Sequence, residues 1–325
     1  MPELSIVVIS WNARDVLKGC LESLKPVVAD GSCRVLVVDN ASEDGSAEMV
    51  SSDYPDVTLI KAESNLGFAR ANNLALASTT TDYVLLLNSD TVVTRDAILR
   101  MLTALKTNPE YAIVGCRQVD GDGNEHNAFG RFPSLRRELS TLTGAFQWPV
   151  VRWLIARRRT LAAVRAKSRN HDCEDPGASG IAIAPVEWIN GACMMMRRDI
   201  GGLDERFFFY GEDIDICMRA WKSRRGVGFL PDVSIVHYGG VSSKSNYLVL
   251  LRQFMIAQLQ LFDKHHSRGA VIGLKCVYLA AGCTALVKWW FIRMFMPGRR
   301  HSAMEWIKFW TGSLPAILGG VRRSR

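Results

Sequence analysis

Four short apolar runs, separated by segments with helical spacing, constrain the fold of this chain more than any other feature. The runs lie within 4–12, 33–42, 57–63 and 82–90, and each contains at least three valine, isoleucine or leucine residues. A continuous apolar run of this length predicts a strand that is buried on both faces of a parallel sheet. Because helical segments alternate with these strands, we expect βαβ units and an α/β fold with a doubly wound, mostly parallel sheet.

Polar side chains follow each of the expected strands. In open parallel sheets, ligands bind beyond the carboxyl ends of the strands. We therefore expect one edge of the sheet to carry a binding site. The polar groups that reach this edge are Asn12, Asp39, Asn65 and the triplet Asn88–Ser89–Asp90.

Asp90 is the third residue after a leucine run, 85–87, of the expected buried strand. A carboxylate at this position could hold a metal together with a diphosphate, because Mg²⁺ and Mn²⁺ accept a few carboxylates plus phosphate oxygens and water. The alternative is an Asx turn that ends the strand, since Asn, Ser and Asp form such turns routinely. The triplet alone leaves both interpretations open.

Three acidic residues, Glu212, Asp213 and Asp215, follow an aromatic run at 207–210. Crowded carboxylates repel one another unless they are solvated, paired or close to a metal. One of them could be a general base whose pKa is raised by an apolar wall, with Arg219 placed to pair with Asp215. Alternatively, the three acids simply favour the positive end of a helix dipole.

His237 ends another apolar strand and precedes a glycine pair. A histidine at this place could ligate the same metal or contact a phosphate. A structural or surface role is the alternative.

In their order and spacing, these segments resemble glycosyltransferase family 2, whose fold is GT-A, near its bacterial rhamnosyltransferase and galactofuranosyltransferase branches. The resemblance covers about residues 3–243. The segments that carry it are 5–24, 35–46, 65–73, 85–90, 188–199 and 201–219.

The resemblance implies a role for each matching residue. Asp213 would be the catalytic base, and Asp90 and His237 would hold Mg²⁺ or Mn²⁺. Asp39 would bond the pyrimidine base of a nucleotide sugar. The expected donor site is Ser10, Asn12, Asp39, Asn65, Gly67, Asn72, Asn88 and Ser89. The expected acceptor and supporting residues are Trp188, Gly191, Glu212, Asp215 and Arg219.

Asn88 departs from the pattern, because many relatives carry aspartate at this position. An amide brings no charge, so the metal should bind weakly without the nucleotide.

The implied reaction is direct displacement with inversion at the anomeric carbon. We expect dTDP-L-rhamnose as the first-choice donor and a glycan or polyprenyl-linked glycan as acceptor, in the synthesis of a cell-surface polysaccharide. A UDP-sugar donor (galactofuranose, glucose or GlcNAc) is the alternative, as is a non-catalytic carbohydrate-binding relative. A phosphoryl or nucleotidyl transferase would need a basic phosphate loop near the first strand, where only Arg14 stands.

Charge is distributed unevenly, although the whole chain carries +8. Residues 1–130 carry −8, residues 131–215 carry +2 and residues 216–325 carry +14. The basic C-terminal part predicts an anionic partner. Anionic lipid fits better than nucleic acid, because the basic residues alternate with tryptophans and apolar runs. We therefore expect a catalytic domain at 1–244 and a helical region at 245–325 that docks on a membrane surface or forms a homodimer.

The apolar segment 269–296 is interrupted by Lys275, Lys288 and Arg293. A membrane-spanning helix needs about 20 apolar residues without such charges. We expect an interfacial or dimer-forming helix, with a true span or ordinary core packing as alternatives.

The eight cysteines form no C-x-x-C pair, and the N-terminal segment lacks the basic and cleavage regions of a signal peptide. We therefore expect reduced thiols and a cytoplasmic protein, peripheral on the inner face of the plasma membrane. We also expect a basic helix over 152–169 and a strand within 186–199.

Overall fold

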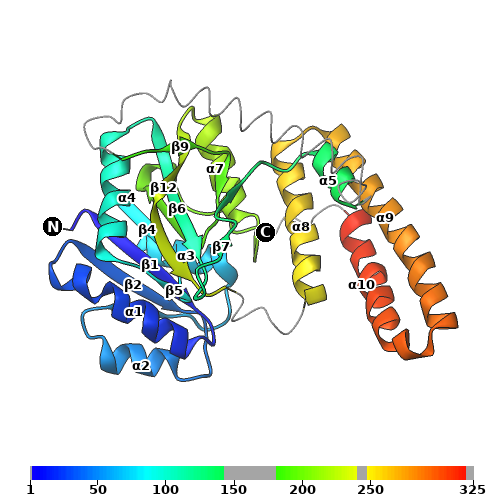
Figure 1. Ribbon diagram of the computed structural model, residues 1–325, viewed down its shortest axis with the longest axis horizontal. Coiled ribbons are helices and arrows are strands. Elements are labelled where there is room, and N and C mark those ends of the chain that lie inside the picture. Colours follow the sequence, from blue (N-terminus) through cyan, green and yellow to red (C-terminus); the bar gives the residue numbers. More distant parts are fainter. Residues whose placement is uncertain (1, 143–180, 240–246, 320–325) are drawn as a thin grey trace. The chain divides into compact units, whose positions relative to one another are not determined.

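The computed structural model describes residues 2–142, 181–239 and 247–319. The chain forms two compact units, one of residues 1–132 with 177–245 and one of residues 133–176 with 246–325. The first is a sheet with helices on both faces, and the second is helical (Figure 1). The basic helix expected over 152–169 lies outside the described residues.

Strands and helices alternate along the first half of the first unit. These elements are β1 (Leu4–Ser10), α1 (Arg14–Ala29), β2 (Cys33–Asp39), α2 (Ser46–Asp53), β3 (Thr58–Lys61), α3 (Gly67–Ala77), β4 (Tyr83–Asn88), β5 (Thr91–Val92), α4 (Arg95–Thr107) and β6 (Tyr111–Val119). The remaining elements are β7 (Glu125–His126), β8 (Phe129–Gly130), β9 (Ala184–Pro185), β10 (Trp188–Ile189), β11 (Cys193–Arg197), a 3₁₀ turn at Arg198–Ile200, α7 (Glu212–Lys222) and β12 (Gly226–His237).

The main sheet has the order β3-β2-β1-β4-β11-β6-β12-β5. Strand β1 is parallel to both β2 and β4, and β12 is parallel to β6. Strand β11 runs antiparallel between β4 and β6. The expected doubly wound, mostly parallel sheet is therefore confirmed, with one reversed strand at its centre.

Both faces of the central strands are buried, as their continuous apolar sequences predict. Along β1, Ile6 and Val8 belong to one core cluster and Val7 to the other. Helices α1 and α4 contribute to the first cluster, whereas α3 and α7 contribute to the second. This sandwich of helix, sheet and helix fixes the strand ends firmly. The cysteines within the described residues are all free.

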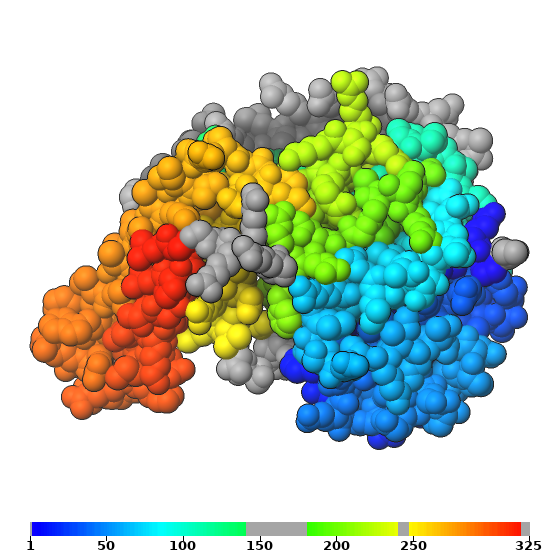
Figure 2. Space-filling model, turned by 180° about the vertical axis from the view of Figure 1, so that it is seen from behind, coloured from blue at the N-terminus to red at the C-terminus, as the bar shows by residue number. Residues whose placement is uncertain are grey.

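The second unit is a group of packed helices. They are α5 (Leu135–Leu142), α8 (Tyr247–His265), α9 (Arg268–Phe295), a 3₁₀ turn at Pro297–Arg299, and α10 (Arg300–Leu318). Its core contains Phe262, Leu274, Tyr278 and Trp310. Helices α9 and α10 lie side by side, the first orange and the second red in Figure 2.

Candidate active site

The carboxyl ends of β1, β2 and β4 bring three predicted donor residues to one edge of the sheet. In the strand register, Ser10 pairs with Asp39, and Ile9 pairs with Asn88. Ser10 and Asp39 are buried, yet Ser10 Oγ and Asp39 Oδ1 have no hydrogen-bond partner among the described residues. Buried polar atoms are normally paired. These two are therefore candidates to bond a ligand.

The loops after β1 and β2 hold each other. Asn12 Oδ1 accepts a hydrogen bond from Glu43 N at 2.8 Å, and Asn12 N donates to Ser42 Oγ at 3.0 Å. Asp39 Oδ2 accepts from Ser42 N at 3.1 Å, so only Oδ1 of this carboxylate is left for a ligand. Asn12 and Ala41 have positive φ angles of 48° and 62°. Strained backbone of this kind often accompanies functional sites.

Asn40 organises the segment that precedes α3. Its Nδ2 donates to Asn65 Oδ1 at 3.0 Å, and its Oδ1 accepts from Leu66 N at 2.8 Å. Asn65 Oδ1 also accepts from Gly67 N at 2.9 Å. The side-chain oxygen of Asn65 is therefore already engaged in holding the loop.

Gly67 allows the aromatic segment around Phe208 to approach α3. Its φ is +76°, and a Cβ atom on it would lie 2.4 Å from Phe208 O. The next residue, Phe68, donates its backbone N–H to the same oxygen at 2.9 Å. Asn72, one turn further along α3, donates to Phe68 O at 2.9 Å, and its own Oδ1 is buried without a partner in the described structure.

Asp90 and His237 are brought together by the pairing of β5 with β12. In this antiparallel pair His237 lies opposite Thr91, and Tyr238 N donates to Asp90 O at 3.0 Å. As a result, His237 Nε2 lies 3.3 Å from Asp90 Oδ1. The two side chains are only 14% and 13% exposed. The two predicted metal ligands, 147 residues apart in sequence, thus face each other.

Gln118, near the end of β6, is a site residue that the sequence reasoning missed. It is fully buried, and its Oε1 lies 3.0 Å from His237 Nδ1. If that oxygen accepts the Nδ1 proton, Nε2 is left with a lone pair directed toward Asp90. The available signal was a polar side chain close to the carboxyl end of an apolar strand.

The tip of β4 connects this pair to Asp213. Asn88 N donates to Ala192 O at 3.0 Å, and Gly191 N lies 3.3 Å from Asp213 Oδ2, which accepts its hydrogen bond. A Cβ atom on Gly191 would meet Asp213 Cβ at 3.6 Å. The turn between β10 and β11 therefore links the strand end that carries Ser89 and Asp90 to the predicted base.

Asp213 is the second residue of α7, and its environment suits a general base. Burial raises the pKa of its carboxyl group, although hydrogen bonds from Ile214 N and Gly191 N oppose the shift. Burial, and then the neighbouring Asp213 charge, also raise the pKa of Glu212. Glu212 Oε2 is buried and has no partner within the described residues. A carboxylate with a raised pKa accepts a proton more readily at neutral pH.

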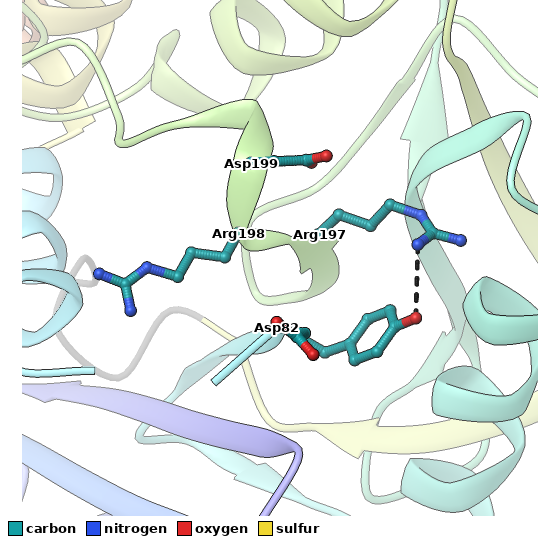
Figure 3. Close-up of a pocket in the computed structure, with 5 residues that line it drawn as sticks. Asp82, Arg197, Arg198 and Asp199 are labelled. Carbon is teal, nitrogen blue, oxygen red and sulfur yellow. Dashed lines mark hydrogen bonds between the residues drawn. The ribbon is translucent and has the colours of Figure 1, made fainter. Parts of the chain in front are cut away.

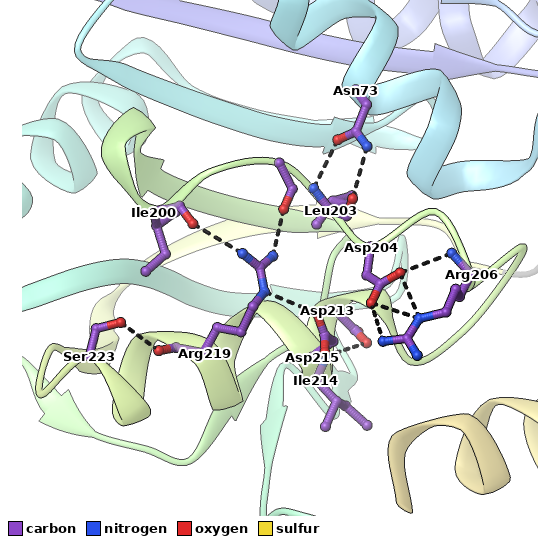
Figure 4. Close-up of polar contacts among 11 residues, drawn as sticks. Asn73, Ile200, Leu203, Asp204, Arg206, Asp213, Ile214, Asp215, Arg219 and Ser223 are labelled. Atoms are coloured by element: carbon purple, nitrogen blue, oxygen red, sulfur yellow. Dashed lines mark hydrogen bonds and ion pairs between the residues drawn. The ribbon is translucent and has the colours of Figure 1, made fainter. Parts of the chain in front are cut away.

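Asp215 and Arg219 form a structural pair beneath Asp213 (Figure 4). Asp215 is fully buried, and Arg219 Nε donates to Asp215 Oδ2 at 3.0 Å. The same guanidinium group donates to Ile200 O at 3.1 Å and to Gly202 O at 2.5 Å. The pair therefore braces the loop that precedes α7.

Asn73 holds the same loop from α3. Its Oδ1 accepts from Leu203 N, and its Nδ2 donates to Leu203 O, both at 2.8 Å (Figure 4). No local sequence pattern predicts this contact, since 130 residues separate the two partners.

Trp188 lies in β10, where its indole ring covers Gly130 of β8. A Cβ atom on Gly130 would lie 2.6 Å from the ring, and Trp188 Nε1 donates to Arg131 O at 3.0 Å. The ring is half-buried. Its role on the acceptor side stays a prediction.

A separate cavity of about 490 Å³ lies at the opposite edge of the sheet (Figure 3). It is lined by Asp82, Tyr83, Arg197, Arg198 and Asp199. Tyr83 begins β4 and Arg197 ends β11, so this cavity is distant from the strand ends that carry Asp90 and Asp213. The guanidinium groups of Arg197 and Arg198 point to opposite sides in Figure 3, and each donates to backbone carbonyls. We do not assign the cavity to the candidate active site.

Comparison with known proteins decides the family. The model of the family described as "Glycosyl transferase family 2" matches residues 5–167, which is half of the chain. This chain belongs to glycosyl transferase family 2. It is a glycosyltransferase with the GT-A fold, as its motifs predicted.

Two curated relatives resemble most of the chain. The N-acetylglucosaminyl-diphospho-decaprenol L-rhamnosyltransferase of Mycobacterium tuberculosis is 27% identical over 251 residues, covering 72% of this chain and 76% of the relative. The rhamnosyltransferase WbbL of Escherichia coli is 22% identical over 74% of this chain and 85% of its own length.

Solved structures share the fold at low sequence identity. A mannosyltransferase from Pyrobaculum calidifontis, in complex with GDP-Man and Mn²⁺, has a TM-score of 0.51 and 16% identity, covering 98% of this chain and 87% of its own. GalNAc-T7, with UDP, GalNAc and Mn²⁺, has a TM-score of 0.54 and 12% identity, covering 81% of this chain and 48% of its own.

The raised pKa of Asp213 predicts how its replacement affects stability. A carboxyl group with a raised pKa in the folded state destabilises the fold when it is ionised, above that pKa. We expect Asp213→Asn to unfold at the same or a higher temperature than the wild type at pH 8, with the difference shrinking as the pH falls through the pKa of Asp213.

Thermal unfolding between pH 5 and pH 8 measures this difference. Asp56→Asn, at an exposed position, is the control and should change little at any pH. A clear loss of stability in Asp213→Asn at pH 8 would contradict a desolvated carboxylate.

Proposed function

We propose that this protein is an inverting glycosyltransferase that moves a sugar from a pyrimidine nucleotide to a lipid-linked glycan. The arrangement that carries the proposal is the placement of Asp213, in the first turn of α7, near the Asp90–His237 pair. The turn at Gly191 joins Asp213 to the end of β4 that precedes Asp90. One group suits proton removal from an acceptor, and the other suits the departing diphosphate.

Asp213 acts as the general base in this proposal. Its carboxylate takes the proton of an acceptor hydroxyl, whose oxygen attacks the anomeric carbon from the face opposite the nucleoside diphosphate. The new glycosidic bond forms as the bond to the diphosphate breaks, which inverts the configuration. The hydrogen bonds from Gly191 N and Ile214 N hold the carboxylate in place during this step.

A divalent metal fits the residues at Asp90 and His237. The described residues contain no cluster of three or more His, Cys, Asp or Glu side chains, so the protein would supply two ligands and the diphosphate and water the others. Imidazole suits Mn²⁺ better than Mg²⁺, which prefers oxygen ligands. When bound, the metal neutralises the charge that develops on the diphosphate. Asn88 lies at the strand end beside this pair but adds no charge.

Asp39 is the proposed partner of the pyrimidine base. Its free Oδ1 can accept a hydrogen bond from the N3–H of uracil or thymine, and Ser10 Oγ lies at the paired position of the neighbouring strand. The rhamnosyltransferase names of two relatives favour dTDP-L-rhamnose as the donor. A UDP-sugar is the alternative, because the same carboxylate oxygen would bond either base.

The acceptor and the place of action follow from similar reasoning. The mycobacterial relative is named for an acceptor that is a sugar diphosphate on decaprenol. A lipid-linked glycan would require the enzyme to work at the inner face of the plasma membrane. In this proposal, residues 1–244 carry out the transfer and residues 245–325 dock on the membrane or on a second copy.

Replacement of the base tests the proposal. A thermal-shift panel of UDP-, dTDP- and GDP-sugars with Mn²⁺ first selects the donor. We expect Asp213→Asn to lower the rate of transfer at least about 100-fold, because general bases contribute about 10²–10⁴-fold, while the selected donor still raises the melting temperature.

The exposed Asp199→Asn is the matched control and should retain full activity, since Asp199 pairs with Arg225 at the far edge of the sheet. Unchanged turnover in Asp213→Asn would refute the base assignment. A product that retains the donor's anomeric configuration, measured by NMR, would refute direct displacement.

Gln118 provides a test of the metal site. We expect Gln118→Met to raise the Mn²⁺ concentration for half-maximal donor binding by about 10- to 100-fold, because residues that orient a metal ligand have effects of this size. Donor binding is followed by isothermal titration at several Mn²⁺ concentrations. Gln258→Met, at a buried glutamine of the second unit, is the control and should leave the Mn²⁺ requirement unchanged. Equal requirements in both variants would contradict a role for Gln118 in orienting His237.

A further inference from the structure

Helix α9 packs one face into the core of the second unit and leaves the other exposed. Leu274, Tyr278 and Gly282 are its buried residues. Five large apolar residues near its C-terminal end are 51–68% exposed: Val287, Trp290, Phe291, Met294 and Phe295. Their spacing, i, i+3, i+4, i+7 and i+8, places them on a single face of the helix. We call these five residues the apolar stripe.

The aromatic rings of the apolar stripe contact one another. Trp290 and Phe291 have ring centroids 5.5 Å apart, and Phe291 and Phe295 are stacked at 5.9 Å. The chain then continues with Met296, which is 48% exposed. A contiguous exposed apolar surface of this kind marks an interaction site.

Basic side chains surround the stripe. Lys288 and Arg293 lie within the same stretch of α9, and Arg299 and Arg300 follow at the turn into α10; all four are exposed. Residues 268–319 contain seven lysines and arginines but one acidic residue, Glu305, which pairs with Lys308 at 3.7 Å. An apolar, tryptophan-bearing face with basic flanks complements an anionic lipid surface.

We propose that the apolar stripe docks on an anionic phospholipid bilayer, with α9 lying at the level of the headgroups. Trp290, Phe291 and Phe295 enter the boundary with the acyl chains, while Lys288, Arg293, Arg299 and Arg300 contact lipid phosphates. The inference deepens the proposed function and rests on it, since an enzyme with a lipid-linked acceptor works at a bilayer surface.

The packing of α9 favours this arrangement over a membrane span. Helix α9, Arg268–Phe295, is long and apolar enough to cross a membrane, judged by its length and composition alone. However, Tyr278 lies in the core with its hydroxyl 3.4 Å from Glu138 of α5, and Lys275 Nζ donates to Gly319 O at 3.1 Å. The stripe from 287 to 295 rises only about 12 Å at about 1.5 Å per residue, against about 30 Å of hydrocarbon. A stripe this short does not cross the hydrocarbon, whereas a helix that lies in the plane of the headgroups buries its apolar face only about 5–10 Å deep.

Cosedimentation with vesicles tests the apolar stripe. The full chain is mixed with phosphatidylcholine vesicles that contain either no or about one-third phosphatidylglycerol, without donor or acceptor. We expect binding to the anionic vesicles, and we expect Trp290→Gln/Phe291→Gln to weaken it at least tenfold. The matched control is Tyr247→Gln/Val249→Gln, which removes two apolar residues of α8 that are at least as exposed and should bind like the wild type.

Two double variants test whether the basic residues beside the apolar stripe contribute to vesicle binding. Arg299→Gln/Arg300→Gln should weaken binding to anionic vesicles by about 25-fold, at about fivefold per cation near the surface. Lys18→Gln/Arg34→Gln removes two exposed cations of the first unit and should have no effect.

Two results would overturn the inference. One is equal vesicle binding by the stripe variant and its α8 control. The other is a wild-type dimer that dissociates in the stripe variant without lipid, seen by analytical ultracentrifugation, which would show that a second copy covers the stripe. A protein that binds vesicles but transfers no sugar would refute the proposed function and leave this inference standing.

Discussion

The antiparallel pairing of β5 with β12 is the interaction on which the candidate active site depends. It places His237 opposite Thr91 and fixes the backbone of Asp90 through the amide of Tyr238. A strand pair sets which face each side chain occupies, and a shift by one residue would turn His237 away from Asp90. The approach of these two residues is therefore determined by backbone hydrogen bonds. Gln118 Oε1 then contacts Nδ1 of the imidazole ring at 3.0 Å.

Hydrogen bonds also position the other candidate residues at this edge of the sheet. The turn at Gly191 bonds the tip of β4 on one side and the carboxylate of Asp213 on the other, so it connects the strand end before the Asp90–His237 pair to the proposed base. Behind Asp213, Asn73 and the Asp215–Arg219 pair brace the preceding loop from two helices. Burial of Asp213 and Glu212 disfavours their ionised forms. We interpret this electrostatic cost as a consequence of function, because a base that works near neutral pH needs a raised pKa.

Much of this arrangement could be predicted from the sequence, for identifiable reasons. Apolar runs predict parallel strands that are buried on both faces. The last residues of parallel strands, such as Asp39 and Asn88, lie at one edge of the sheet. The antiparallel insertion of β11 could not be predicted, because a strand's direction depends on distant partners. Residues 95–119, which form α4 and β6, were not anticipated, and with them Gln118 was missed. Asn73 was missed as a brace because its partner lies 130 residues away. The tail was recognised as basic and apolar, but only its packing separates the buried face of α9 from its exposed stripe.

We propose that Asp90 and His237 act together on the diphosphate of a nucleotide sugar. Crystals grown with Mn²⁺ and a pyrimidine nucleoside diphosphate test it most directly through the anomalous signal of manganese. We expect one peak within coordination distance of both the Asp90 carboxylate and His237 Nε2, with diphosphate oxygens completing the shell. A peak bound to the diphosphate but remote from both side chains would contradict it.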